Sequence, residues 1–251
     1  MTEEPTIEFK NKTVKLTAEP NVNIEDALNS NPFKTWFEDL PMTKFELHSV
    51  HFQSVDYFGQ RVGFVKFKAS ITFNGKFVPG IVFARGGAVA ILVKVICKET
   101  NEEYSVLTVQ PRVPIPSSGF PEIPAGMLDD ETEKFSGVAA KEMEEETGII
   151  VKTSDLIDLT KLVYGERFRG SVYPSPGGCD EFIKLYYYQT EMGQEKLEEL
   201  NNKMTGLLEE REQITLKIVK FDELWKETSD CKTLSALFLY EKLKKEGVIK
   251  K

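Results

Sequence analysis

The stretch AGMLDDETEKFSGVAAKEMEEETGI, residues 125–149, carries the strongest structural signal in this chain. Its pattern predicts a helix over 133–147 that a glycine ends in the left-handed conformation. Two acids on that helix, Glu145 and Glu146, follow Glu142 by three and four residues, so all three lie on one face. Crowded carboxylates repel each other unless cations bind between them, and oxygen ligands of this kind suit Mg²⁺ or Mn²⁺. We therefore expect a divalent metal site on this face.

The regions outside this helix predict sheets and further helices. Residues 65–73 alternate between apolar and polar side chains, which is typical of a half-buried strand. Asn74 and Gly75 then predict a hairpin turn back through 76–83, so we expect an antiparallel N-terminal sheet of about three strands. Other strands are expected at 88–97, 104–110, 181–189 and 214–220, a proline-rich loop at 111–124, and helices at 194–203 and 230–246. This alternation indicates a mixed α/β fold.

The last of these helices has an apparent apolar face. Four residues at helical spacing, Leu234, Leu237, Phe238 and Leu243, are expected to share that face.

Composition narrows the classes of function. Of the 251 residues, 41% are hydrophobic, which is enough for a buried core. The 40 acidic and 32 basic residues give a net charge of −8, which disfavours binding to nucleic acid or to an anionic membrane. The first ten residues resemble no signal or transit peptide, and the longest apolar run, 88–97, is about half the length of a membrane span. We therefore expect a cytoplasmic protein.

Cysteine and histidine are too sparse for several kinds of site. The three cysteines are far apart and form no CxxC pair, and the two histidines stand three residues apart in a strand-like stretch. This pattern argues against a disulfide framework, a zinc knuckle and catalysis by a serine or cysteine with a histidine base.

The spacing of 126–149 resembles the motif of the Nudix hydrolases, G-x5-E-x7-R-E-U-x-E-E-x-G-U, in which U is aliphatic. Here six residues separate Gly126 from Glu133, and seven more precede Lys141. The chain thus departs from the motif by one inserted residue and by lysine in place of arginine. Lysine keeps the positive charge but lacks the guanidinium fork that holds a carboxylate through two hydrogen bonds.

The resemblance covers the chain from about Asn31 to Val248 and is closest to the ADP-sugar pyrophosphatases known from plants. It rests on the strings VPGIVFARGGAVAILV, QPRVPI, IPAGMLDD, YPSPGGCDE and LWKETSDCKTL. It implies a Nudix fold, which is an α/β/α sandwich with a mixed sheet, over 86–251. It also implies an N-terminal antiparallel β domain over 1–85, which serves dimerisation and contacts the substrate's base.

The resemblance implies an enzyme and a metal centre. The implied reaction is Mg²⁺-dependent hydrolysis of a nucleoside diphosphate sugar, of the ADP-glucose or ADP-ribose type, to a nucleoside monophosphate and a sugar 1-phosphate. Glu142 and Glu146 are the implied main metal ligands, with the carbonyl of Ala125, and Glu145 shares the metal or the reacting water. Gly126 is expected to turn the chain tightly so that this carbonyl faces the metal.

The resemblance also implies the residues for the base and the substrate. The general base comes from an acidic loop, for which we favour Glu212 and then Glu210. Arg85 and Arg112 stand where relatives use arginine on phosphate or ribose, and Glu181 stands where they place a glutamate near the metal. Relatives are homodimers, so a homodimer is expected.

Two other functions stay open from the sequence. Preference for UDP-glucose or another UDP-sugar would depend on a few contacts in the base pocket. A catalytically inert Nudix module that only binds a nucleotide would be expected to lack the helix acids, all three of which are present.

Overall fold

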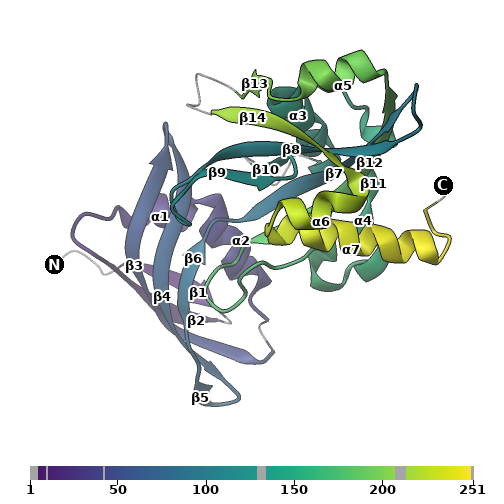
Figure 1. The fold of residues 1–251 in the computed structure, drawn as a ribbon. Coiled ribbons are helices and arrows are strands. Elements are labelled where there is room, and N and C mark those ends of the chain that lie inside the picture. Colours follow the sequence, from purple (N-terminus) through teal and green to yellow (C-terminus); the bar gives the residue numbers. More distant parts are fainter. Residues whose placement is uncertain (1–4, 10, 42, 129–133, 207–212, 250–251) are drawn as a thin grey trace. The chain divides into compact units, whose positions relative to one another are not determined.

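The structure, a computed structural model of the chain, describes residues 5–9, 11–41, 43–128, 134–206 and 213–249 (Figure 1). The chain divides into two compact units. The first comprises Met1–Gly86 with Ser175–Glu181, and the second comprises Gly87–Pro174 with Phe182–Lys251. A short segment of the later chain therefore belongs with the N-terminal region, although no local pattern in the sequence indicates it.

The first unit is built on a six-stranded sheet in the order β1-β2-β3-β4-β5, with β6 also paired to β4. Its strands are β1 Thr6–Phe9, β2 Lys12–Ala18, β3 Phe45–Phe58, β4 Arg61–Phe73, β5 Lys76–Phe77 and β6 Ile81–Ala84, and its helices are α1 Ile24–Asn29 and α2 Asn31–Asp39. The core contains Phe33 of α2, whose ring lies edge-on against Phe52 and Phe67 of the sheet.

This sheet is larger than expected and is not wholly antiparallel. Asn74 and Gly75 have φ of 50° and 75°, as the predicted hairpin turn between β4 and β5 requires. However, β2 and β3 pair in parallel. The connection between them contains both α1 and α2, and a connection of this kind is long enough to return the chain in the same direction.

The second unit is built on an eight-stranded sheet in the order β11-β12-β7-β8-β14-β13, with β10 on β7 and β9 on β8. Its strands are β7 Gly87–Cys97, β8 Glu103–Arg112, β9 Ser117–Glu122, β10 Ala125–Met127, β11 Ile157–Asp158, β12 Phe182–Met192, β13 Met204–Thr205 and β14 Ile214–Lys220. The long pair β7–β12 is parallel and the pairs of β7 with β8 and β10 are antiparallel, so the sheet is mixed.

Helices cover both faces of this mixed sheet (Figure 1). They are α3 Phe135–Thr147, α4 Leu159–Tyr164, α5 Gln194–Leu200, α6 Leu224–Glu227 and α7 Cys231–Lys245. Alternate side chains of β7 enter two separate cores, one with Met143 of α3 and the other with Leu239 of α7. Because both faces of β7 are buried, its sequence is almost continuously apolar. The predicted mixed α/β class is confirmed.

Helix α7 buries a different face from the one expected. Leu234 and Phe238 are 38% and 58% exposed, and Leu243 is the fully buried member of the predicted set. The face that meets the sheet contains Thr233, Ala236, Leu239, Tyr240 and Leu243. The prediction that the four residues share one face was wrong, because Leu243 follows Leu234 by nine residues and therefore lies on the opposite side of the helix.

The proline-rich loop expected at 111–124 contains strand β9, which pairs with β8. Pro121 has no N–H to donate, but among the described strands β9 pairs only with β8 and so lies at an edge, where proline is tolerated. This strand leads directly into β10 and so determines where the next residues lie.

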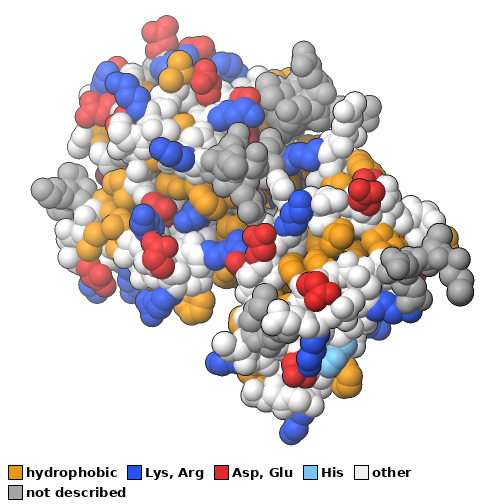
Figure 2. All heavy atoms as spheres, turned by 180° about the vertical axis from the view of Figure 1, so that it is seen from behind, with side chains coloured by type: hydrophobic (Ala, Val, Ile, Leu, Met, Phe, Trp, Pro, Cys, Tyr) orange, Lys and Arg blue, Asp and Glu red, His pale blue; other side chains and the backbone are white. Residues whose placement is uncertain are grey.

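Within the described residues, no helix combines the length and the apolar character needed to cross a membrane. Figure 2 shows one face of the molecule, on which basic and acidic side chains are interspersed and do not form a single basic surface.

Candidate active site

Helix α3 presents Glu142 directly to strand β10. A Cβ atom built on Gly126 would lie 1.9 Å from the carboxyl carbon and from Oε1 of Glu142. No side chain other than hydrogen therefore fits at position 126 while this carboxylate stays in place. Gly126 does not have a positive φ and lies within β10, so the expected tight turn is wrong. Glycine is required here for space and not for backbone conformation.

One helical turn further on, Glu146 reaches the neighbouring residue of β10. Its Oε2 accepts a hydrogen bond of 3.0 Å from the N–H of Ala125, and the residue is only 3% exposed. A buried carboxylate is costly unless hydrogen bonds or cations compensate it. The backbone carbonyl of Glu146 is also held, by the hydroxyl of Thr205 in β13. The orientation of Glu146 is therefore fixed from two sides.

The carbonyl of Ala125 faces the same way as its N–H. In an antiparallel pair, each residue directs both backbone groups either toward its partner strand or away from it. The neighbouring carbonyl of Pro124 accepts from Ile91 of β7, whereas the N–H of Ala125 points to Glu146. The Ala125 carbonyl is thus directed away from β7, on the side of α3, where the predicted ligand should be.

Glu145 lies on the same helix at the edge of this face. Its carboxylate pairs with Lys141 at 3.6 Å, one turn earlier, and the Glu145 side chain is 26% exposed. A partly exposed ion pair of this kind contributes at most about 1 kcal/mol and is easily rearranged. Glu145 is therefore able to turn to another cation.

The donors of α3 and β10 fit a hard divalent cation. Among the described residues, no group of three or more His, Cys, Asp or Glu side chains is placed so that it could hold a metal ion. Two carboxylates and a carbonyl meeting on β10 match the way proteins hold Mg²⁺, which keeps water ligands and is bound through one or two carboxylates plus substrate phosphate. In such a site Glu142, Glu146 and the Ala125 carbonyl would hold the ion.

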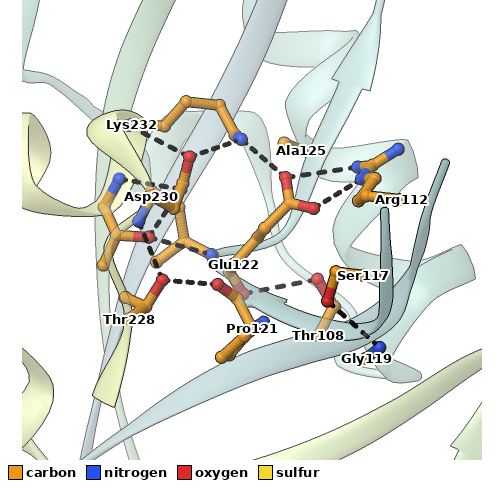
Figure 3. Close-up of polar contacts among 12 residues, drawn as sticks. Thr108, Arg112, Ser117, Gly119, Pro121, Glu122, Ala125, Thr228, Asp230 and Lys232 are labelled. Atoms are coloured by element: carbon orange, nitrogen blue, oxygen red, sulfur yellow. Dashed lines mark hydrogen bonds and ion pairs between the residues drawn. The ribbon is translucent and has the colours of Figure 1, made fainter. Parts of the chain in front are cut away.

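Arg112, at the end of β8, belongs to a line of alternating charges shown in Figure 3. Its Nε and Nη2 donate to the two oxygens of Glu122, at 2.5 and 3.2 Å. Lys232 donates to Glu122 at 2.6 Å and to Asp230 at 2.8 Å. Glu122 ends β9, just before β10, so this line adjoins the strand that carries Ala125.

The charges in this line favour one another. Burial acts to lower the pKa of Arg112, but its hydrogen bond with Glu122 and the charges of Glu122, Glu146 and Asp230 outweigh burial, so the pKa is raised. Burial also opposes the charge of Lys232, and the charges of Asp230 and Glu122 raise its pKa in the same way. The charge of Glu146, on the acidic face of α3, is thus one of the causes that raise the pKa of Arg112.

Asp230 also connects α7 to the strand before β10. As the N-cap residue of α7, it accepts from the N–H groups of Lys232 and Thr233. The hydroxyl of Thr233 donates to Asp230 at 2.8 Å and accepts from the N–H of Ile123 at 3.1 Å. The start of α7 therefore holds the segment that leads to Ala125.

Arg85 and Glu181 come together within the first unit. Their side chains pair at 3.4 Å, and the guanidinium of Arg85 also lies over the ring of Phe64. Asp180 accepts from the N–H groups of Arg85 and Gly86. Burial raises the pKa of Asp180, although these hydrogen bonds and the charge of Arg85 act to lower it. The segment 175–181 thus determines where both predicted residues lie.

The predicted residues divide into three groups. Ala125, Glu142, Glu145, Glu146 and Arg112 belong to the second unit, and Arg85 and Glu181 to the first. The predicted bases Glu210 and Glu212 lie outside the described residues, as does Glu133. Glu122 and Lys232 were not predicted. The sequence signals for them were weak and came from two of the quoted strings. Glu122 directly precedes IPAGMLDD, and Lys232 lies inside LWKETSDCKTL.

The chain is similar to known proteins in sequence and in fold. A model of the NUDIX domain matches residues 89–237. The chain is 41% identical over 239 residues to a protein named Nudix hydrolase 14, chloroplastic, from Arabidopsis thaliana, covering 90% of this chain and 75% of that protein. A solved structure described as an ADP compounds hydrolase matches with a TM-score of 0.52 and 16% identity, over 82% of this chain and 97% of its own. At that identity the match shows a shared fold.

Proposed function

This chain belongs to the Nudix hydrolase family, and from that premise we propose that it hydrolyses the pyrophosphate bond of ADP-sugars such as ADP-glucose or ADP-ribose. The products would be a nucleoside monophosphate and a sugar 1-phosphate. The reaction needs neutralisation of the pyrophosphate, a water aligned with one phosphorus and a base for that water.

One observation carries this proposal. Glu142 and Glu146, on successive turns of α3, meet Gly126 and Ala125, which are neighbours in β10. Carboxylates on successive turns of one helix face repel each other, and a cation between them would offset that repulsion. A site with this donor set binds Mg²⁺, which would neutralise the charge of a pyrophosphate and orient it. Mn²⁺ has similar ligand preferences and is an alternative.

Residues of the chain would hold the reacting water, accept its proton and bind the substrate. Glu145, whose partly exposed carboxylate pairs with Lys141, would hold the reacting water, and Glu212 or Glu210 would accept its proton. Arg112 has N–H donors outside its pair with Glu122, so it suits a phosphate or ribose oxygen. Arg85 and Glu181 are proposed as further substrate contacts from the first unit.

The proposed substrate class is supported by sequence strings. The relative at 41% identity is named only as a Nudix hydrolase, and the solved structure that acts on ADP compounds shares the fold alone. The ADP preference therefore rests on the string resemblance described above. We further propose a homodimer and a role for the N-terminal unit in contacts with the base. A cytoplasmic location also stays a proposal, and the printed name of the Arabidopsis relative is chloroplastic.

The substrate proposal can be tested by product separation. The protein is incubated with ADP-glucose, ADP-ribose or UDP-glucose and Mg²⁺, and the nucleotides are separated by anion exchange. We expect AMP from the ADP-sugars, with kcat/KM higher for them than for UDP-glucose. A higher kcat/KM for UDP-glucose would overturn the proposed ADP preference but would not affect the assignment as a hydrolase. Absence of Mg²⁺-dependent hydrolysis with all three would favour the nucleotide-binding module.

A further inference from the structure

The line Asp230–Lys232–Glu122–Arg112 runs from the interior of the second unit to its surface. The side chains of Glu122, Asp230 and Lys232 are 4%, 5% and 15% exposed, whereas that of Arg112 is 41% exposed. Three charges are thus buried behind a fourth that reaches solvent. Each buried member touches its neighbours at 2.5 to 3.2 Å, so the line is continuous.

The contacts with Glu122 use only one edge of the guanidinium. Nε and Nη2 each donate once to the carboxylate, and an arginine has five N–H donors in a fixed plane. Three donors therefore lie outside this pair. Because the guanidinium is planar, holding the Nε–Nη2 edge also fixes the direction of the Nη1 edge.

Lys232 holds the same carboxylate from the opposite end of the line. It donates to Oε2 of Glu122, the oxygen that also accepts the longer bond from Arg112. A carboxylate held by arginine alone can rotate with its partner, whereas a second cation at a fixed place prevents this. Lys232 is itself fixed by Asp230, which caps α7.

Stability alone is a poor reason for such an arrangement. Burying an ion pair costs desolvation that its attraction often does not exceed, and apolar residues of similar volume are often equally stabilising. Two cations that bind one buried carboxylate fix the orientation of the groups involved more than they stabilise the fold. Glu122 is three residues before Ala125, whose N–H donates to Glu146 of α3, and the charge of Glu146 acts on Arg112, so the orientation of Arg112 would matter for a phosphate-bearing ligand.

We propose that Glu122 and Lys232 are positioning residues for Arg112: together they hold its Nε–Nη2 edge so that the remaining edge meets phosphate or ribose oxygens of the substrate. This inference rests on the proposed function for its substrate. It assigns to Glu122 and Lys232 no contact with the reacting atoms. Their effect passes through Arg112 alone.

The test is a double-mutant cycle in kinetics and in binding. Glu122→Gln keeps the shape of the side chain and removes its charge, and it is made alone and together with Arg112→Ala. KM and kcat are measured with ADP-glucose and Mg²⁺, and the Kd of ADP is measured by calorimetry. We expect Glu122→Gln to raise KM about tenfold with less than about threefold change in kcat, as loss of uniform binding does.

The Arg112→Ala background separates positioning from general damage. There, Glu122→Gln should change neither KM nor the Kd of ADP by more than about twofold, because contacts that act through one another are not additive. Lys232→Met should behave like Glu122→Gln, and Lys232→Arg should restore wild-type KM. Glu223→Gln, which breaks the exposed pair of Glu223 with Lys226, is the matched control and should leave KM unchanged.

Several results would overturn the inference. They are a wild-type KM in Glu122→Gln, an equal loss in the Arg112→Ala background, or no rescue by Lys232→Arg in a protein with wild-type melting behaviour. If Glu122→Gln does not fold, the two Lys232 variants make the same comparison. If wild-type protein hydrolyses no nucleotide sugar, the proposed function fails, and the ADP binding cycle still decides whether Glu122 acts through Arg112.

Discussion

The carboxylate of Glu142 occupies the space that a side chain at position 126 would need, since a Cβ there would lie 1.9 Å from its carboxyl carbon. The strand β10 and the helix α3 can approach this closely only at a glycine. This contact places the carboxylate of Glu142 against Gly126. One helical turn later, the carboxylate of Glu146 accepts a hydrogen bond from the N–H of Ala125. The relation between a single glycine and a single acid thus sets the geometry of the proposed metal site.

Gly126→Ala should therefore reduce activity far more than stability. The methyl group would displace the end of a flexible side chain, so we expect the free energy of unfolding to fall by no more than about 1 kcal/mol. A displacement of about 1 Å at a reactive site costs about 100-fold in rate, and we expect a loss of that order in kcat/KM. Gly137→Ala on the same helix is the control, because nothing lies within 4 Å of its Cβ position. Equal activities of the two variants would contradict this account.

The acids of α3 should differ sharply when they are neutralised one at a time. Glu142→Gln and Glu146→Gln should each lower kcat by at least about 100-fold and raise the Mg²⁺ concentration needed for half-maximal activity. Glu144→Gln removes the same charge from the exposed side of the helix and should change kcat by less than about threefold. EDTA should abolish the wild-type activity and excess Mg²⁺ should restore it. Full activity of Glu146→Gln would refute the metal assignment.

Lys232 predicts a specific dependence of stability on pH. Its pKa is raised above the ordinary 10.5 because the charges of Asp230 and Glu122 outweigh burial. The folded state therefore binds the proton more tightly than the unfolded state, so the stabilisation is complete below pH 10.5 and is lost as the pH rises through the raised pKa.

Comparison of wild-type protein with Lys232→Met isolates this contribution. Loss of one partner from a buried ion pair costs about 3 kcal/mol, so urea unfolding should show a difference of that order at pH 8. The difference should stay constant to about pH 10 and shrink at higher pH. A difference that grows above pH 10 would show that the sign of the shift is wrong.

Thr233 should matter for stability through its hydroxyl alone. It is fully buried, accepts from the N–H of Ile123 and donates to Asp230. Thr233→Val keeps the volume and leaves the buried N–H without that acceptor, which should lower the free energy of unfolding by about 1–3 kcal/mol. Ser235→Ala, two residues along the same helix, should change it by less than about 0.5 kcal/mol. Denaturant unfolding of both variants checks this.

The proposed general base can be tested although it lies outside the described residues. Glu212→Gln should lower kcat by about 100-fold or more and remove the acidic limb of the pH–rate profile, because a neutral amide cannot accept the water's proton. Glu210→Gln would show this effect instead if it is the base. Glu209→Gln serves as control in the same acidic run. Unchanged pH–rate profiles in all three variants would show that another residue is the general base.

Local patterns were sufficient for the elements that local forces decide. The strand at Gly87–Cys97 is apolar along nearly its whole length, and the helix that ends at Gly148 has helical spacing and a left-handed glycine, so both were predicted. The carboxylates of that helix were predicted for the same reason, because positions three and four apart share a face whatever surrounds them. The motif around them indicated the family, which the NUDIX match confirms.

Contacts between distant segments could not be predicted in this way. The parallel pairing of β2 and β3, the strand β9 within a proline-rich stretch and the buried face of α7 depend on which surface each segment meets. The joining of 175–181 to the first unit is of the same kind. Glu122 and Lys232 are 110 residues apart, and neither residue's neighbourhood indicates that they share an ion pair.

The chain's residue order thus determined the helix, its acids and the kind of ion they suit, because backbone geometry sets those relations within a few residues. Only the tertiary structure decided that Glu142 lies on Gly126, that Glu146 holds Ala125, and that Arg112 is held from behind. Each of these depends on the close packing of segments far apart in the chain. The packing of β10 against α3, and the contacts of α7 with Glu122 and Ile123 before β10, select which side chains meet.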